Sequence, residues 1–384
     1  MGKKQFFIIC GEASGDLHAA TLVNAIRAQD PQVTFLAVGG SRLREAGATL
    51  IADIKDFSVI GFFDVLAKLP LFFRLKKLVL QKIKEEKPSL LILVDFSGFN
   101  LRLAKELRKT VPTIYYISPQ VWASRQGRIE TIRRYIHKML VFFRFEEEFY
   151  ESHGIKVECV GHPLLDIVKP SMEKKEFLAT YGLSDAKTTI ALLPGSRHTE
   201  IQHNLPVMLQ SARRIYQYKR DVQFVIAKTP QMSFDIYNTI IGGPNINITI
   251  VDAKTYDCVS AADFCLVASG TATLETAILG TPFCIIYKIG ALNYLLYRPQ
   301  VRVPHIGIVN IIAGKEIVPE FIQSQATPRK ISDFVLKTLQ TPSEMQRIKE
   351  SLTQVTSDLG EPGAAGRAAT IILDTLKATL KTSP

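Results

Sequence analysis

The sequence predicts an α/β fold made of two doubly wound halves, each built on a parallel sheet. Short apolar runs alternate with longer amphipathic segments along most of the chain, a pattern typical of parallel strands covered by helices. The alternation stops at residues 161–171, which hold Gly-His-Pro and Lys-Pro-Ser without periodicity, and then begins again. A chain of 384 residues is long enough for two domains, each with a core of its own.

Five strands are expected in each half, each followed by a loop rich in Gly, Ser or Pro. They lie near residues 5–10, 33–39, 89–95, 113–117 and 139–143 in the first half, and near 188–193, 223–227, 246–251, 264–268 and 283–287 in the second. After residue 328 the pattern is helical to the end, with prolines separating three amphipathic segments. We therefore expect domains at 1–168 and 169–345, and helices over 346–384 that pack back toward the first domain.

Charge and cysteine usage narrow the classes of partner. The chain has 47 Lys and Arg against 36 Asp and Glu, a formal net charge of +11, which favours an anionic partner. Nucleic acid is the least favoured, because the sequence has no basic base-reading helix, zinc pattern or RNA-binding aromatic motif.

The five scattered cysteines form no CxxC pair and indicate reduced thiols rather than zinc or disulfides. The first residues lack a signal-peptide pattern, so a cytoplasmic protein is expected.

Residues 57–79 form the most apolar segment, interrupted by lysines and arginines. It is too short and too charged for a membrane span. Apolar side chains interrupted by cationic ones suit a helix lying in an anionic membrane surface. The competing interpretation is a helix buried against the sheet. The candidates for membrane contact are Phe62, Phe63, Phe72 and Phe73.

Ligands of doubly wound folds bind at the carboxyl ends of the strands, so the loops there are the candidate sites. Asp95 ends a fully apolar strand and is the best general-base candidate; the competing interpretation is a helix cap. The other candidates of the first half for substrate contact are Ser14, Asn100, Gln120, Trp122 and His162. Three of them have a structural alternative: a cap for Ser14, a turn for Asn100 and core packing for Trp122.

The second half holds two loops suited to a nucleotide. Gly195 and Ser196 offer backbone amides at a helix start while Arg197 offers a bidentate partner for a diphosphate. The turn with Ser269, Gly270 and Thr271, and then Glu275 one helical turn later, suits a phosphate and a ribose. No DxD triplet occurs, so no metal and no other cofactor is expected; Lys288 would help Arg197 with the diphosphate.

Six segments together resemble the lipid-A-disaccharide synthase family. They are GEASGD at 11–16, SPQVWA at 118–123, VGHPLLD at 160–166, LLPGSR at 192–197 with the Glu-Ile that follows, ASGTATLE at 268–275 and VPEFIQ at 318–323. The resemblance implies a GT-B glycosyltransferase, with two Rossmann-like domains facing a central cleft. It also implies the reaction, in which UDP-2,3-diacylglucosamine and 2,3-diacylglucosamine 1-phosphate give a β-1,6-linked disaccharide and UDP at the inner membrane of Gram-negative bacteria.

The same resemblance implies roles for individual residues. Asp95 matches the base that deprotonates the acceptor 6-hydroxyl, and Asn310 matches an asparagine of the donor site. The two loops of the second half match the family's diphosphate and nucleotide loops. The chain departs from the usual pattern, which has Pro and Asp at Ser97 and Gly98, a second Trp at Ser124 and a Pro at Arg144.

Two alternatives stay open on the residues alone. One is another GT-B enzyme that uses UDP-N-acetylglucosamine, such as a peptidoglycan glycosyltransferase or a 2-epimerase. The other is a module that binds UDP or lipid without chemistry. The reaction of unacylated donors and the release of UDP distinguish them.

Overall fold

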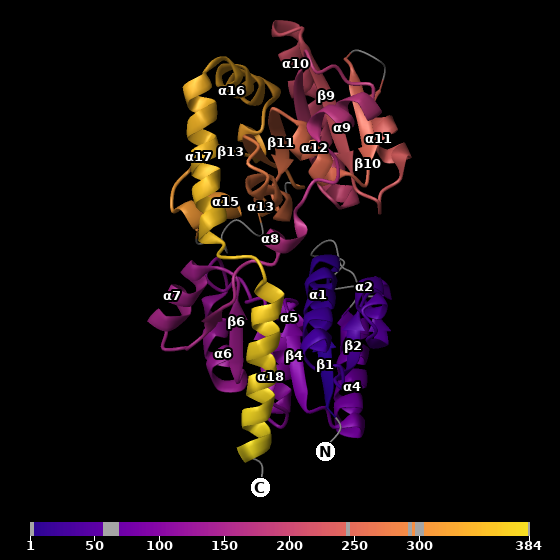
Figure 1. The fold of residues 1–384 in the computed structure, drawn as a ribbon, viewed down its shortest axis with the longest axis vertical. Helices are drawn as coiled ribbons and strands as arrows, with labels where there is room; N and C mark the ends of the chain where they lie inside the picture. The colour runs from indigo at the N-terminus through magenta and orange to yellow at the C-terminus, as the bar shows by residue number, and fades with distance from the viewer. Residues whose placement is uncertain (1–3, 57–68, 243–245, 291–293, 296–302, 383–384) are drawn as a thin grey trace. The chain divides into compact units, whose positions relative to one another are not determined.

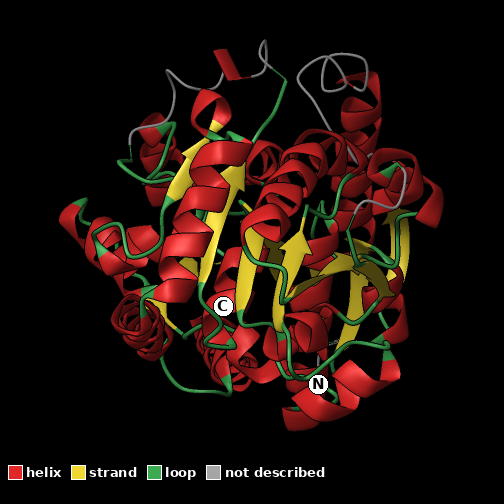
Figure 2. Ribbon diagram, turned by 90° about the horizontal axis from the view of Figure 1, so that it is seen from above, coloured by secondary structure: helices red, strands yellow, loops and turns green. Residues whose placement is uncertain are grey.

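The computed structural model describes residues 4–56, 69–242, 246–290, 294–295 and 303–382. The described residues form two compact units. One runs to Pro163 and takes up the chain again from Leu359; the other runs from Leu164 to Asp358. Each unit is a parallel sheet between layers of helices (Figures 1 and 2), which confirms the predicted fold class.

The first unit holds a seven-stranded sheet in the order β3-β2-β1-β4-β5-β6-β7. Its strands are β1 (Gln5–Ile9), β2 (Thr34–Gly39), β3 (Thr49–Asp53), β4 (Leu90–Val94), β5 (Thr113–Tyr116), β6 (Lys138–Val141) and β7 (Glu158–Cys159). The helical elements are α1 (Ala13–Gln29), α2 (Ser41–Glu45), η1 (Ile54–Asp56), α4 (Leu69–Glu86), α5 (Ser97–Leu107), η2 (Gln126–Arg128), α6 (Ile129–Tyr135), α7 (Arg144–Ser152) and α18 (Ala364–Thr382).

The second unit holds a six-stranded sheet in the order β10-β9-β8-β11-β12-β13. Its strands are β8 (Thr188–Leu193), β9 (Val222–Lys228), β10 (Ile248–Asp252), β11 (Phe264–Ala268), β12 (Phe283–Tyr287) and β13 (Glu320–Ile322). The helical elements are α8 (Leu164–Ile167), α9 (Lys174–Thr180), α10 (His198–Tyr218), α11 (Phe234–Ile241), α12 (Thr255–Ala261), α13 (Thr271–Ile278), α15 (Ile308–Ala313), η4 (Gln323–Gln325), α16 (Pro328–Gln340) and α17 (Pro342–Asp358).

All ten expected strands are present, and three further strands, β3, β7 and β13, extend the edges of the sheets. These edge strands are two to five residues long and only partly buried, so they lack the continuous apolar run that marks a buried parallel strand. One boundary also differs from expectation. Strand β4 ends at Val94 because Asp95 and Phe96 take positive φ angles of 45° and 47°, which no strand accommodates.

The C-terminal helices divide between the two units. Helix α17 packs against α13 and α15 of the second unit, whereas α18 packs along α1 of the first. Five side chains of α18 belong to the first unit's core, namely Ala368, Ala369, Ile372, Leu373 and Leu376. The two helices separate at residues 360–363, where Gly360 and Gly363 have φ angles of 88° and 91°. The expected domain bounds at 168 and 345 stay predictions.

Helix α4 carries the described part of the segment singled out for membrane contact. Its inner face buries Leu75, Val79 and Ile83 against the sheet, four residues apart as a helix requires. Its outer face exposes Phe73 together with Lys77. No described helix is long and apolar enough to cross a membrane.

Candidate functional site

Asp95 lies at the carboxyl edge of the first unit's sheet, directly after the central strand β4. Every residue of β4 is buried, and β1 and β5 flank it. Two side chains hold the main-chain carbonyl of Asp95: Asn100 donates from Nδ2 over 2.8 Å and Tyr115 from its hydroxyl over 2.5 Å. The backbone that carries the carboxylate is therefore fixed from two neighbouring elements.

The electrostatics at Asp95 suit a proton acceptor. Partial burial raises the pKa of its carboxyl group from 3.8 to about 6, and the negative charge of Glu12 contributes in the same direction. A carboxylate with a raised pKa holds a proton more strongly than an ordinary aspartate and is still ionised near neutral pH. The arrangement can accept a proton from an alcohol.

An aromatic cluster adjoins Asp95. The ring of Phe96 stacks on Phe99 with centroids 5.1 Å apart and lies 6.0 Å from the ring of Phe72 on α4. Residue 11 must be glycine, because a Cβ there would lie 2.2 Å from the Phe96 ring. The small residue of the first loop is thus explained by packing against the segment that follows Asp95.

Trp122 and Glu146 form a buried polar pair beyond β5. The indole nitrogen donates to Glu146 Oε1 over 3.1 Å, and the indole packs edge-on against Phe145. Burial raises the pKa of Glu146 from 4.5 to about 7, against the opposing effect of the Trp122 hydrogen bond. Glu146 also caps the first turn of α7, accepting from the amides of Phe142 and Phe143.

This pair predicts a fluorescence titration. Trp122 is the only tryptophan of the chain, so its emission should change as Glu146 ionises, with a midpoint near pH 7. Glu146→Gln should abolish the transition. Emission that is constant from about pH 5.5 to 8.5 in the unmodified protein would show that Glu146 does not titrate there.

The remaining candidates of the first unit have different surroundings. Ser14 and Gln120 are exposed, whereas Asn100 is fully buried and bonds to main-chain carbonyls. His162 is buried against the rings of Phe142 and Phe143, 5.0 and 5.1 Å away, and burial lowers its pKa to about 3. Asn100 and His162 therefore have structural surroundings, and contact with substrate stays a prediction for all four.

In the second unit, the loops after β8, β11 and β12 lie together because these three strands are neighbours. Gly195, Ser196 and Arg197 follow β8 and lead into α10. The amides of Ser196 and Arg197 donate to Glu200 Oε2 over 3.0 and 3.3 Å, while the Arg197 guanidinium bonds to Glu200 Oε1 over 3.1 Å. A carboxylate of the chain itself thus occupies the groups that the sequence analysis assigned to a diphosphate, and diphosphate binding stays a prediction.

The turn after β11 leaves its backbone open at Gly270. Gly270 has a φ of 152°, and a Cβ placed on it would meet no described atom within 4 Å. Ser269 is partly buried, Thr271 begins α13 and is exposed, and Glu275 lies one turn further. The Glu275 carboxylate accepts from the Tyr256 hydroxyl over 2.9 Å, and burial raises its pKa.

Asn204 links these loops and was missed by the sequence analysis. Its Nδ2 donates to the carbonyls of Pro194 and Glu200, and its Oδ1 accepts from the amide of Lys288 over 3.0 Å. The available sequence signal was an asparagine among the apolar positions of a long amphipathic helix. It ties the end of β12 to the loop after β8.

Asn310 is a structural residue of the second unit. Its Nδ2 donates to Val318 O and Glu320 Oε1, and its Oδ1 accepts from the amides of Ile317 and Val318. These four bonds satisfy both N–H donors and both acceptor positions of the side-chain amide. A direct contact of Asn310 with the donor stays a prediction, and the contacts within the chain favour a supporting role.

Two further regions complete the comparison with the sequence. Phe62 and Phe63 lie outside the described residues, Phe72 packs on Phe96, and Phe73 is 61% exposed.

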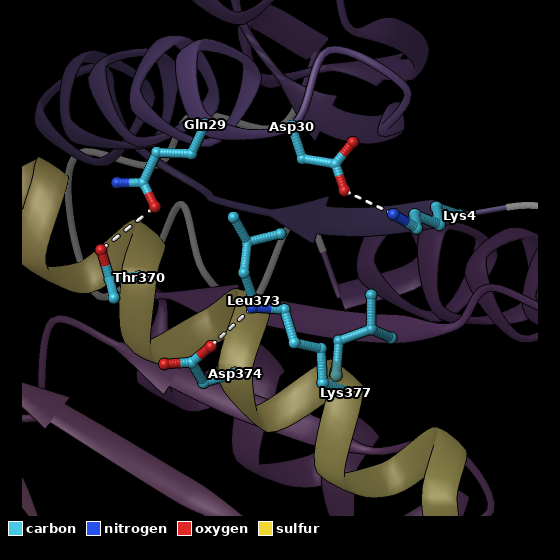
Figure 3. Close-up of a pocket in the computed structure, with 8 residues that line it drawn as sticks. Lys4, Gln29, Asp30, Thr370, Leu373, Asp374 and Lys377 are labelled. Carbon is cyan, nitrogen blue, oxygen red and sulfur yellow. Dashed lines mark hydrogen bonds and ion pairs between the residues drawn. The ribbon is translucent and has the colours of Figure 1, made fainter.

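A pocket of about 190 Å³ lies between α1 and α18 (Figure 3). Its lysines are paired, Lys4 with Asp30 and Lys377 with Asp374, and none of the candidate residues lines it.

Comparison with known proteins decides the family. The model of lipid-A-disaccharide synthetase matches residues 6–373. The chain belongs to this family. The lipid-A-disaccharide synthase of Syntrophus aciditrophicus is 44% identical, with 98% of this chain and 99% of the relative covered, and that of Geobacter sulfurreducens is 39% identical, with 97% of each covered. The chain is therefore a glycosyltransferase of lipid A biosynthesis with lipid-A-disaccharide synthase activity, and its substrates are lipid A precursors.

Solved structures agree on the fold. A Staphylococcus aureus MnaA structure with UDP aligns with a TM-score of 0.64 at 14% identity, over 99% of this chain and 98% of that chain. The glycotransferase of kitacinnamycin aligns with a TM-score of 0.62 at 12% identity, over 98% and 100%. The two parallel sheets and the C-terminal helices are those of the GT-B fold.

Proposed function

We propose that the chain, as a lipid-A-disaccharide synthase, transfers the sugar of UDP-2,3-diacylglucosamine to the 6-hydroxyl of 2,3-diacylglucosamine 1-phosphate by a single displacement. The acceptor oxygen forms a bond to the donor's anomeric carbon while the bond from that carbon to the β-phosphate oxygen breaks. The proton of the 6-hydroxyl passes to the carboxylate of Asp95, and UDP leaves with the bonding electron pair. One observation carries the proposal: a half-buried carboxylate with a pKa raised to about 6, its backbone held by Asn100 and Tyr115.

The second unit would bind the donor. In this proposal the diphosphate takes the place of the Glu200 carboxylate at the amides of Ser196 and Arg197, and the Arg197 guanidinium moves from Glu200 to the phosphate oxygens. Positive charge and amide dipoles at the leaving group stabilise the transition state. The ribose would contact Glu275, beside the turn with Ser269, Gly270 and Thr271.

Product analysis tests the proposal. With both acylated substrates, mass spectrometry should find the disaccharide 1-phosphate in amounts equal to the UDP released. UDP-N-acetylglucosamine without acyl chains should not be consumed. Consumption of the unacylated nucleotide sugar, or release of UDP when the acceptor is omitted, would count against the substrate assignment.

We further propose that the outer face of α4 binds an anionic membrane surface. Phe73 is exposed, and Arg74, Lys77 and Lys84 are exposed on the same helix. An aromatic ring among cations suits the boundary between headgroups and acyl chains. Such a contact would bring the enzyme to substrates that reside in the bilayer.

Vesicle flotation tests this contact. Phe73→Ser should reduce flotation with phosphatidylglycerol vesicles, because it removes the exposed apolar side chain without opening the core. Tyr218, 69% exposed on α10, provides the control: Tyr218→Ser should float as the unmodified chain does. Equal flotation of all three proteins would contradict the proposal.

A further inference from the structure

Three arginines gather at the start of α5, directly after the segment that holds Asp95. Arg128 of η2 donates from its guanidinium to Ser97 Oγ over 2.8 Å. Arg102 lies about one turn further along α5, and Arg125 lies three residues before Arg128. Helices α5 and α6 pack against each other, so the two arginine-bearing segments are neighbours.

Arg128 is unusual because it is half-buried without a carboxylate. Among the described residues no Asp or Glu forms an ion pair with it, and the only hydrogen-bond partner of its guanidinium there is the neutral Ser97 hydroxyl. Burial lowers the pKa of Arg128, and repulsion from the charges of Arg125 and Arg102 lowers it further. A partly buried cation that is repelled by two others lacks the counter-charge that such groups normally have.

The first turn of α5, which Arg128 contacts at Ser97, is exposed at Gly98. A Cβ placed on Gly98 would meet no described atom within 4 Å. Ser97 and Gly98 are the first residues of α5, an eleven-residue helix, and the first amides of a helix have no partner inside it. Guanidinium groups provide the planar donors that match phosphate oxygens.

Tyr115 connects this cluster with the proposed base. Its hydroxyl bonds to the Asp95 carbonyl, and its pKa responds to the charges of both Asp95 and Arg128. Asp95 and Arg128 therefore both lie near the same phenol. An acceptor sugar carries its 6-hydroxyl and its 1-phosphate on opposite sides of the ring oxygen, so one molecule can reach both groups.

We propose that Arg128, with Arg102 and Arg125, binds the phosphomonoester of the acceptor and so sets the direction in which its 6-hydroxyl approaches Asp95. The inference rests on the proposed function, since that function supplies a phosphorylated acceptor. Arg128 is the central contact, because Ser97 already holds its guanidinium. Phosphate binding would also relieve the repulsion among the three arginines.

Acceptor kinetics in neutral detergent micelles test the assignment. Arg128→Gln should raise the KM for 2,3-diacylglucosamine 1-phosphate by about 10- to 100-fold, as expected for loss of a hydrogen bond to a charged group. The KM for the UDP-sugar should not change. Arg128→Lys should raise the acceptor KM by a smaller factor, because lysine keeps the positive charge. Arg108→Gln changes an exposed arginine just beyond the other end of α5 and should have no effect.

A second acceptor separates phosphate recognition from misfolding. With 2,3-diacylglucosamine lacking the phosphate, the acceptor KM of the unmodified enzyme should rise by at least the same factor. On this acceptor Arg128→Gln should raise the KM no further. Equal losses of the variant on both acceptors would overturn the inference. So would a loss that appears only on phosphatidylglycerol vesicles, because the arginines would then contact a lipid headgroup. If the unmodified chain transfers to neither acceptor, the proposed function itself fails and the inference falls with it.

Discussion

Asp95→Asn is expected to slow sugar transfer by about 10²- to 10⁴-fold while the affinity for the UDP-sugar stays unchanged. Asparagine has the size of aspartate but cannot take the acceptor proton. The proposed donor loops belong to the other unit, so the substitution should leave them intact. The measurement is a single-turnover rate at saturating donor, together with calorimetric binding of the donor to the same variant.

The thermal stability of Asp95→Asn distinguishes the loss of a catalytic base from misfolding of the variant. The pKa of Asp95 is higher in the folded protein, about 6, than its ordinary 3.8, so the folded state binds the proton more tightly than the unfolded chain does. The resulting stabilisation is full below pH about 3.8 and is lost as the pH rises through about 6. At pH 7 the neutral asparagine should therefore unfold at a temperature no lower than the aspartate. A transfer rate near that of the unmodified enzyme would refute the role of Asp95.

Arg197→Gln is expected to lower kcat/KM for the donor by about 10²- to 10³-fold, with most of the loss in kcat. The reason is that negative charge grows on the departing diphosphate, so the guanidinium contributes more in the transition state than in the ground state. The backbone of the loop should survive, because Glu200 still accepts from the amides of Ser196 and Arg197.

The matched control for this variant is Arg220→Gln. Arg220 is exposed just beyond the far end of α10, over the ring of Tyr216, and its loss should leave the kinetics unchanged. A variant at Arg197 that raised the donor KM alone, with kcat preserved, would mean that this arginine binds the ground state only. The leaving-group role would then pass to another cation, with Lys288 the first candidate.

Apolar periodicity predicted the two sheets because parallel strands such as β4 and β11 are buried throughout and therefore read as continuous apolar runs. The same signal is absent from β7, which has two residues. Asp95 was predictable because a carboxylate after such a strand has to lie at the sheet's carboxyl edge. Its positive φ was not, since the angle depends on how Phe96 packs over Gly11.

Sequence patterns do not show which partners the supporting residues contact. Glu146 has no sequence pattern that singles it out, yet tertiary packing buries it beside Trp122. Asn204 acts through a contact with Lys288, which is distant in the chain, and Asn310 through contacts with the segment leading into β13. Arg128 became notable only when the structure showed which partners it has and which it lacks.

The pH dependence of transfer tests most directly whether Asp95 is the base. A base works only when ionised, so with a pKa near 6 kcat/KM should fall tenfold per pH unit below about pH 6 and level off above it. The acceptor in this measurement is 2,3-diacylglucosamine without the phosphate, because a phosphomonoester itself titrates near pH 6. In Asp95→Asn the small residual rate should show no such inflection. An inflection near pH 6 that persists in Asp95→Asn, or a flat profile in the unmodified enzyme, would contradict the account.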